Sequence, residues 1–543
     1  MKKYTIWMIL LFVGLQGYAQ QGVLSIPPKN WFNLDPVENK VNGVSSEKAY
    51  NELLKGKTSK KVLVAVIDSG IDIEHEDLKD VIWTNPGEIP NNGIDDDNNG
   101  FIDDVHGWNF IGGKDGRNVG KDSYEVTRYY KILSKKYEGK ELKDIDKKDR
   151  EEFITWQKVK GEFEEAYGKA QMEFEQYGSL ARQIERFNKL FEAYLDVEEV
   201  TAKTLQEIDS DDAVIDLGKN YMSQILQAVD GEVSLDSVLV LINMDLKELE
   251  ANATISYDLN FDSREIVGDD PNKLDEKGYG NNDVSGKGTD NFHGTHVAGI
   301  IAASRGNDLG IDGVASNVSI MAIRVVPDGD EHDKDVANGI RYAVDNGAQI
   351  INMSFGKAYS PNLQYVYEAI EYANSKGVLL VHAAGNSGED IDEANNFPND
   401  KFGKSGDWSN WIEVGASSWG GDGQFVGSFS NYGDKTVDLF APGVAIYSTA
   451  PNNDYQDAQG TSMASPVTAG VAAMLLSYFP DLKADQLKDI LMKSVRKLDG
   501  VKVTKPGTFD QEVNFSKLSK SGGIINAYEA VKMAESMKVG KKK

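Results

Sequence analysis

The chain has 543 residues, contains no cysteine and carries a formal net charge of −28 at pH 7. Its length allows two to four domains and a large buried core. The lack of cysteine excludes disulfide bonds and thiol chemistry. Nucleic acid and anionic membrane surfaces are not expected as partners, because both repel a strongly acidic protein.

The N-terminus has the pattern of a secretory signal peptide. Two lysines follow the first methionine, an apolar run covers residues 6–13, and small residues stand at Gly17 and Ala19. This pattern predicts cleavage after Ala19 and a secreted or periplasmic protein. A membrane anchor is the alternative, but the apolar run is shorter than the roughly 20 residues that span a bilayer, so we expect no anchor.

From residue 61 onward, short apolar runs rich in β-branched residues alternate with stretches of helical periodicity. Helices are expected at 333–346 and 362–376, with Gly347 and Gly377 placed to end them. Strands alternating with helices indicate an α/β fold with a doubly wound, mostly parallel sheet covered on both faces. The expected strands are 62–67, 320–326, 349–353, 378–383, 411–414 and 437–440.

A long stretch without proline, between Pro90 and Pro271, interrupts this alternation of strands and helices. From Phe153 to Tyr194, apolar residues recur in steps of three or four, which is close to the spacing of a coiled-coil seam. A second helical stretch at 235–249 could pack against it. We therefore predict a large α-helical insertion at 120–260, either as surface decoration or as a site for a protein partner.

Three motifs of small residues contain an Asp, a His and a Ser in that order along the chain. They are AVIDSGID around Asp68, FHGTHVAG around His293 and GTSMASP around Ser462. Nucleophilic acyl transfer needs this trio, because a hydroxyl attacks, an imidazole takes its proton and a carboxylate orients the imidazole. The three sequences resemble the signature motifs of the subtilase family of serine peptidases, which share this chain order.

The resemblance implies a fold of the subtilisin type and a serine endopeptidase that cleaves protein or peptide substrates through an acyl-enzyme. It assigns catalysis to Asp68, His293 and Ser462, and the oxyanion hole to Asn386 in the segment AAGN. The segment NMSFG resembles the one that pairs with the substrate backbone. The substrate-binding residues implied are Ser354, Gly356, Ala384 and Gly385.

His293 and His296 also have the i, i+3 spacing of two metal ligands on a helix. Zinc would need a third ligand, and no nearby His or Cys offers one. We therefore expect His296 to be a packed helix residue.

The acidic run DDDNNGFIDD begins at Asp95 and has oxygen donors at positions 1, 3, 5 and 9, with glycine at position 6. This matches the first part of an EF-hand calcium loop, but His106 stands where the loop's final glutamate belongs. A plain acidic turn is the alternative to a structural Ca²⁺ site. The expected ligands are Asp95, Asp97, Asn99, Asp103 and the carbonyl of Phe101.

The resemblance covers residues 62–112 and 288–495 and ends with a closing helix near 521–531, which implies a catalytic domain split by the insertion. Asp68 and His293 are 225 residues apart, and segment 20–67 is too short for both the usual inhibitory propeptide and the strand that leads to Asp68. The expected divisions are 1–19 (signal peptide), 20–58, 59–119 (catalytic), 120–260 (insertion), 261–500 (catalytic) and 501–543.

Two other functions fit the same motifs. A maturation peptidase with one dedicated partner would use the insertion as its specificity arm. A catalytically silent binding protein is disfavoured, because Asp68, His293, Asn386 and Ser462 are all present. The sequence does not name the substrate, the side-chain preference, the activation route or the oligomeric state.

Overall fold

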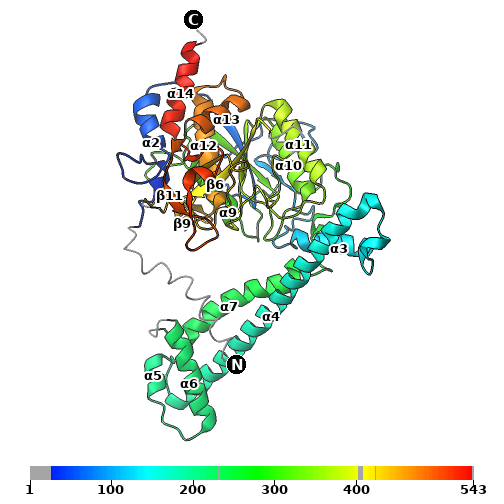
Figure 1. Cartoon of the computed structure of the whole chain (residues 1–543), viewed down its shortest axis with the longest axis vertical. Helices are drawn as coiled ribbons and strands as arrows, with labels where there is room; N and C mark the ends of the chain where they lie inside the picture. The colour runs from blue at the N-terminus through cyan, green and yellow to red at the C-terminus, as the bar shows by residue number, and fades with distance from the viewer. Residues whose placement is uncertain (1–25, 230–232, 402–407, 422, 541–543) are drawn as a thin grey trace. The chain divides into compact units, whose positions relative to one another are not determined.

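The computed structural model describes residues 26–229, 233–401, 408–421 and 423–540 (Figure 1). The predicted signal peptide, residues 1–19, lies outside these described residues. The chain divides into two compact units. We call Val126–Phe261 the helical unit, and Ile26–Glu125 together with the chain from Asp262 onward the sheet unit.

In the described part of the chain, nine strands form the central sheet of the sheet unit, in the order β10-β13-β7-β6-β5-β4-β1-β3-β2. Every neighbouring pair is parallel except β10 with β13. The mostly parallel sheet is therefore confirmed, and the six predicted strands overlap β1 and β3 to β7. The bounds are β1 (Val62–Asp68), β2 (Gly107–Asn109), β3 (Val318–Arg324), β4 (Ile350–Met353), β5 (Leu379–Ala383), β6 (Trp411–Ser417), β7 (Leu439–Pro442), β10 (Arg496–Lys497) and β13 (Gly523–Ile524).

Two antiparallel hairpins accompany the sheet. One joins β8 (Ile446–Ala450) to β9 (Asp454–Ala458), and the other joins β11 (Lys502–Thr504) to β12 (Glu512–Asn514). The first hairpin lies just before helix α12 in the chain and forms part of the surroundings of the site described below.

Helices cover both faces of the central sheet. Successive residues of a strand face opposite sides, so Val64 and Val66 join one hydrophobic core while Ala65 and Ile67 join the other. The first core contains α9 (Phe292–Ala302), α12 (Thr461–Tyr478), α13 (Ala484–Lys493) and α14 (Ala527–Gly540). The second contains α10 (Asp333–Asp345) and α11 (Leu363–Lys376), which lie together in Figure 1. The doubly wound arrangement is confirmed.

Glycines end α10 and α11 as predicted. Gly347 has a φ of 84° and Gly377 a φ of 74°, both in the left-handed region that other residues rarely adopt. Each glycine lets the chain turn back toward the next buried strand, β4 or β5.

The segments that flank the predicted catalytic regions also belong to the sheet unit. Trp31 and Phe32 are fully buried in the core that contains α12, and the Trp31 indole N–H donates to the carbonyl oxygen of Ala445 at 2.9 Å. At the other end of the chain, the N–H of Ala527, which begins α14, donates to the carbonyl of Val44 at 2.7 Å. The N-terminal segment and the C-terminal helix thus pack against each other.

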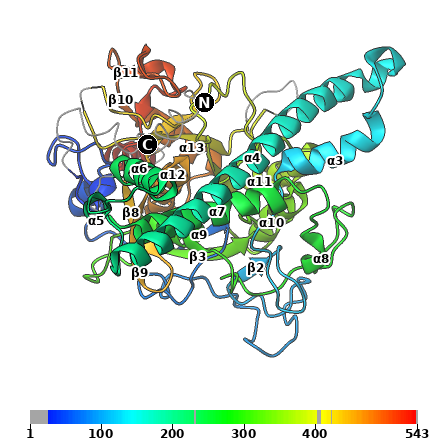
Figure 2. The ribbon, with the colours of Figure 1, turned by 90° about the horizontal axis from the view of Figure 1, so that it is seen from below.

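The helical unit confirms the predicted α-helical insertion. Its longest element, α4, has 46 residues, and α7 runs beside it (Figures 1 and 2). A separate hydrophobic core joins α4, α6 and α7, with Ile184, Phe191 and Leu226 fully buried. The helices are α3 (Glu125–Tyr137), α4 (Arg150–Leu195), α5 (Ala202–Gln206), α6 (Ala213–Ala228) and α7 (Leu235–Ala251). None of the helices in the described ranges is both long and apolar enough to cross a bilayer.

Candidate active site

Candidate catalytic and substrate-binding residues stand at the carboxyl ends of three neighbouring parallel strands. Asp68 ends β1, Ser354 directly follows β4, and Asn386 follows β5. β1 pairs with β3 on one side and with β4 on the other, so the chain reverses its direction of winding at β1. Ligands of open α/β sheets bind beyond the carboxyl ends of the strands at such a point.

Asp68 and His293 form a short hydrogen bond. His293 Nδ1 lies 2.6 Å from Asp68 Oδ1, and the same oxygen accepts the Ser69 N–H at 2.7 Å. His293 is the second residue of α9. Gly294 allows this approach, because a Cβ there would lie 2.2 Å from the carbonyl oxygen of Gly70. Asp68 is buried, so its carboxylate fixes the ring through Nδ1 and leaves Nε2 as the proton acceptor.

Two effects act on the pKa of His293 in opposite directions. Burial lowers it, and the charge and hydrogen bond of Asp68 raise it by more, so the pKa lies above the ordinary histidine value. The imidazolium that forms when His293 takes a proton is therefore stabilised by the carboxylate beside it.

Ser462 is the second residue of α12 and makes a reciprocal pair of hydrogen bonds with Ser354. The Ser462 hydroxyl donates to the Ser354 carbonyl oxygen at 3.0 Å, and the Ser354 hydroxyl donates to the Ser462 carbonyl oxygen at 2.9 Å. A helix would normally satisfy the Ser462 carbonyl with the N–H of residue 466, but residue 466 is Pro466 and has none. The Ser354 hydroxyl supplies the missing donor and ties the start of α12 to the end of β4.

Two N–H donors converge beside Gly460. The Asn386 side-chain oxygen accepts from the Thr461 N–H at 2.9 Å and from the Thr461 hydroxyl at 3.0 Å, which fixes the orientation of the amide. The Ser462 N–H belongs to the first turn of α12 and has no intrahelical partner. A Cβ placed on Gly460 would lie 3.4 Å from Asn386 Nδ2 and 3.5 Å from Ser462 N, so both donors border one small space.

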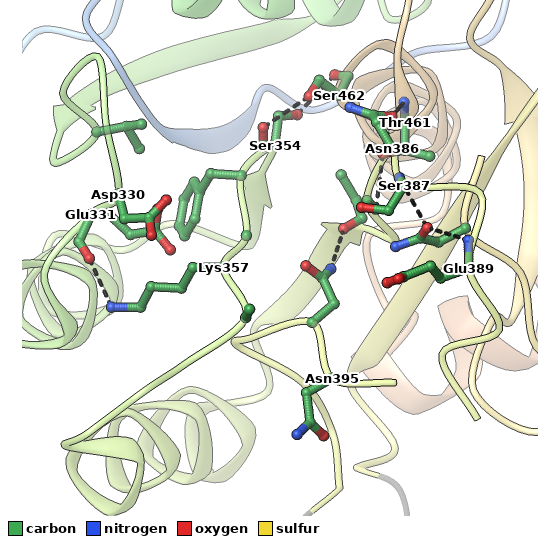
Figure 3. Close-up of a pocket in the computed structure, with 18 of the residues that line it drawn as sticks. Asp330, Glu331, Ser354, Lys357, Asn386, Ser387, Glu389, Asn395, Thr461 and Ser462 are labelled. Atoms are coloured by element: carbon green, nitrogen blue, oxygen red, sulfur yellow. Dashed lines mark hydrogen bonds between the residues drawn. The ribbon is translucent and has the colours of Figure 1, made fainter. Parts of the chain in front are cut away.

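A cavity of about 320 Å³ opens at Ser462 (Figure 3). Of the predicted substrate-binding residues, Ser354, Gly356 and Gly385 line it. Ala384 does not, because its side chain points into a hydrophobic core, and Ala383 lines the cavity in its place. Sequence reasoning also missed a set of polar lining residues: Asp330, Glu331, Lys357, Ser387, Glu389, Asn395, Asn396 and Asn431.

A buried arginine supports the turn that carries Asp68. Arg324 ends β3, and its Nε donates to the Ser69 carbonyl oxygen at 2.7 Å. Its Nη2 donates to the Val119 carbonyl oxygen at 2.6 Å. Burial lowers the pKa of Arg324 to about 10, so the group stays charged at neutral pH. No sequence pattern predicts this role, since Arg324 becomes the neighbour of Asp68 only through strand pairing.

His296 has the packing role that was expected. It is fully buried in α9, and Nε2 lies 3.0 Å from the Gln456 carbonyl oxygen. Burial lowers its pKa to about 4, so the ring is neutral and donates to that carbonyl. Its contact partner is the β8–β9 hairpin, which supports the α9 helix that carries His293.

Carboxylates converge in the acidic loop that the sequence singled out. Among the described residues, Glu88, Asp95 and Asp97 each have an oxygen within 4.8 Å of the others, which is the spacing of ligands around one ion. Glu88 is buried, and its Oε2 has no hydrogen-bond partner. Its donor chemistry and position suit Ca²⁺, which prefers carboxylate oxygens.

Two other predicted calcium ligands of this loop accept hydrogen bonds from the loop backbone. The Asp103 carboxylate accepts the N–H groups of Asn92 and Gly93, and the Asn99 side-chain oxygen accepts the Phe101 N–H at 2.8 Å. These contacts shape the loop backbone, and Asp103 is not in the converging group. Glu88 was missed because it precedes the acidic run by several residues and carries no spacing signal of its own.

Comparison with known proteins shows the family to which the chain belongs. The family model for the subtilase family, Peptidase S8, matches residues 59–515. The chain belongs to the subtilase family. It is 39% identical to subtilisin DY from Bacillus licheniformis over 209 residues, which cover 38% of this chain and 72% of that one.

Two further proteins are similar to this chain. Thermitase from Thermoactinomyces vulgaris is 40% identical over 243 residues, which are 44% of this chain and 75% of thermitase. A solved protease structure from Pseudoalteromonas arctica PAMC 21717 is 31% identical, with a TM-score of 0.35 over 45% of this chain and 70% of that one. The subtilase is a serine endopeptidase that acts on protein or peptide substrates.

The raised pKa of His293 predicts the pH dependence of kcat/KM. A histidine that acts as a general base must be neutral, so with His293 in that role kcat/KM should rise with pH through a midpoint above the ordinary value of 6.5. In Asp68→Asn the attraction is lost while burial remains, so the midpoint should move to lower pH and kcat should fall by about 10⁴. Peptide hydrolysis measured between pH 5 and 10 checks this, and a midpoint that stays or rises in Asp68→Asn would contradict it.

Proposed function

We propose that Asp68, His293 and Ser462 form the catalytic triad of this serine endopeptidase, and that the enzyme is exported. The observation that carries the proposal is the 2.6 Å contact between Asp68 and His293, formed across 225 residues of sequence. Asn386 and the Ser462 N–H supply a second requirement of acyl transfer, two donors that border one space. Export rests on the N-terminal sequence pattern.

The proposed mechanism gives each group a defined role. Ser462 Oγ turns from the Ser354 carbonyl and attacks the carbonyl carbon of the scissile peptide bond, while His293 Nε2 takes its proton. Asn386 Nδ2 and the Ser462 N–H stabilise the oxyanion that forms. The C–N bond then breaks, His293 gives the proton to the leaving amine, and water hydrolyses the acyl-enzyme by the same steps.

Ser462→Ala should remove turnover of peptides and labelling by a fluorophosphonate, because no other group supplies the nucleophile. Asn386→Ala should still be labelled but should lose about 10²–10³ in kcat with little change in KM, since its donor acts mainly in the transition state. Asn220→Ala, which removes an exposed amide in α6 away from the cavity lining, is the control. Labelling of Ser462→Ala at the rate of the unmodified enzyme would overturn the assignment.

We also propose that Glu88, Asp95 and Asp97 hold a structural Ca²⁺ ion. Glu88 Oε1 accepts the Asp96 and Asp97 N–H groups, so one carboxylate oxygen shapes the loop while the buried Oε2 remains for the ion. Three carboxylates in such close proximity repel one another, and a divalent cation offsets that repulsion.

Calcium should therefore raise the unfolding temperature, since an ion that binds only the folded chain stabilises it by mass action. Thermal scans with calcium and with excess chelator should differ by about 3–8 °C, judged from a few kcal/mol of binding energy. Glu88→Gln and Asp97→Ala should abolish the difference, and Asp80→Asn, at an exposed carboxylate that precedes the loop in sequence, should keep it. Equal melting curves in the two buffers would indicate an ordinary acidic turn.

A role in substrate access is proposed for the helical unit. The residues that flank the helical unit in the chain lie close together in the sheet unit, since the Ser263 hydroxyl donates to the Asp122 carboxylate at 2.5 Å. The helical unit also exposes apolar side chains that suit a macromolecular substrate or a protein partner. They are Val214 and Leu217 in α6, and Val240, Leu241 and Met244 in α7.

Replacing Val126–Phe261 by a short Gly/Ser linker should leave the sheet unit folded. The residues at the two ends of the deletion already lie close together, so the linker closes the chain at a small entropic cost. Activity on short chromogenic peptides should persist. Activity on folded proteins should change by about tenfold or more, which is the effect expected when one specific contact region with the substrate is lost. The ratio of the two activities is the measurement. An unchanged ratio in a folded deletion variant would show that the unit only decorates the surface.

A further inference from the structure

A fully buried asparagine in β4 lies among apolar neighbours. Asn352 is in register with Val66 of β1 and Val381 of β5, and both valines belong to the hydrophobic core that contains α12. In-register residues of parallel strands point to the same face, so the Asn352 side chain points toward α12. An amide buried in such a place costs free energy unless its donor and its acceptor both find partners.

Both ends of the Asn352 amide are hydrogen-bonded. Its Nδ2 donates to the Ser354 hydroxyl oxygen at 2.9 Å, and its Oδ1 accepts from the Ser465 hydroxyl at 2.9 Å. Ser465 is buried in α12, about one turn after Ser462, and its Oγ also lies 3.2 Å from the Val381 carbonyl oxygen in β5. The amide therefore links β4 to the N-terminal part of the helix that carries Ser462.

The amide decides where the hydrogen of the Ser354 hydroxyl points. An amide N–H can only donate, so Ser354 Oγ accepts from Asn352 and uses its own hydrogen for the Ser462 carbonyl oxygen, at 2.9 Å (Figure 3). If the amide were reversed, the Ser354 hydroxyl would donate to the amide oxygen, and the Ser462 carbonyl would lose this donor. The Ser465 hydroxyl favours the observed orientation, because it donates to the oxygen end of the amide.

Loss of this donor would act on the residue that carries the nucleophile. The Ser462 carbonyl lacks its usual helical donor, because residue 466 is Pro466, so the Ser354 hydroxyl holds that peptide group in place. Displacement of a reacting group by about 1 Å can lower a rate by about 10². Asn352 itself is not among the described residues that line the cavity at Ser462, so it acts without touching the substrate.

We infer that Asn352 is a positioning residue for the nucleophile. It directs the Ser354 hydroxyl to the Ser462 carbonyl and so keeps the first turn of α12 in the orientation that attack by Ser462 Oγ requires. Ser465 holds the other end of the amide. The inference rests on the proposed role of Ser462 as nucleophile, and it assigns a part in the reaction to a buried residue that the substrate does not reach.

Asn352→Leu tests this in the full chain, because leucine has a similar size and makes no side-chain hydrogen bond. For hydrolysis of a peptide substrate, kcat should fall by about ten- to hundredfold while KM stays within about twofold, as expected when a contact that orients the reacting groups is lost. The rate of fluorophosphonate labelling should fall by a similar factor, since the same hydroxyl attacks.

Asn410→Leu is the matched control. Asn410 is also a buried amide, and its Nδ2 donates to the Val378 carbonyl oxygen at 2.7 Å. It directly precedes β6 and so lies at the amino end of a strand, whereas the site lies at the carboxyl ends. Both variants should unfold at a lower temperature, but Asn410→Leu should keep kcat within about twofold of the unmodified enzyme.

A double variant separates positioning from general damage. Ser354→Ala removes the hydroxyl through which Asn352 acts, and it should itself lower kcat by about ten- to hundredfold. If Asn352 acts through that hydroxyl, adding Asn352→Leu to Ser354→Ala should change kcat by less than about twofold. Two independent effects would instead multiply.

Ser465→Ala decides the question if Asn352→Leu does not fold. It releases the oxygen end of the amide and leaves the Asn352 side chain in place. We expect kcat to fall by about two- to tenfold, and to fall no further when Ser465→Ala is added to Ser354→Ala.

The outcomes distinguish this inference from the proposed function. Turnover that Ser462→Ala abolishes but Asn352→Leu leaves within about twofold would overturn the inference alone. Multiplied losses in the double variant, a change in KM alone, or an equal loss of kcat in Asn410→Leu would overturn it too. An unmodified enzyme with neither turnover nor fluorophosphonate labelling would overturn the proposed function and this inference with it.

Discussion

Parallel pairing of β1 with β3 on one side and β4 on the other decides where the candidate catalytic groups can lie. Parallel strands bring their carboxyl ends to one edge, so Asp68, Ser354 and Asn386 arrive there from distant parts of the sequence. The helices then complete the site from their N-terminal turns, with His293 in α9 and Ser462 in α12. Since both helices pack in one core, a shift of either would disturb the buried face of the whole sheet.

Much of the hydrogen bonding around the site holds backbone in place. Pro466 leaves the Ser462 carbonyl without its helical donor, and the Ser354 hydroxyl replaces it. The Thr461 N–H and hydroxyl hold one end of the Asn386 amide and so aim the other. Such contacts pre-organise donors for a charge that develops only in the transition state, which is where fixed dipoles are worth most.

The strands of the sheet could be predicted because strands buried on both faces are short apolar runs, as 62–67 shows. The Asp68, His293 and Ser462 positions followed from motif resemblance. Strands such as β10 and β13 were missed because two residues carry no periodicity. Glu88 and Asn396 were missed for another reason, since their neighbours are set by loop folding, which no spacing pattern in the sequence predicts.

Contacts of one residue connect the cavity at Ser462 with the point where the chain leaves the sheet unit. Glu125, the last residue of the sheet unit before that departure, donates its N–H to Asp330 and pairs its carboxylate with Lys357. Asp330 and Lys357 both line the cavity. Asp330 and Lys357 are thus held by the residue at which α3 begins, and breaking the buried ion pair would be strongly unfavourable.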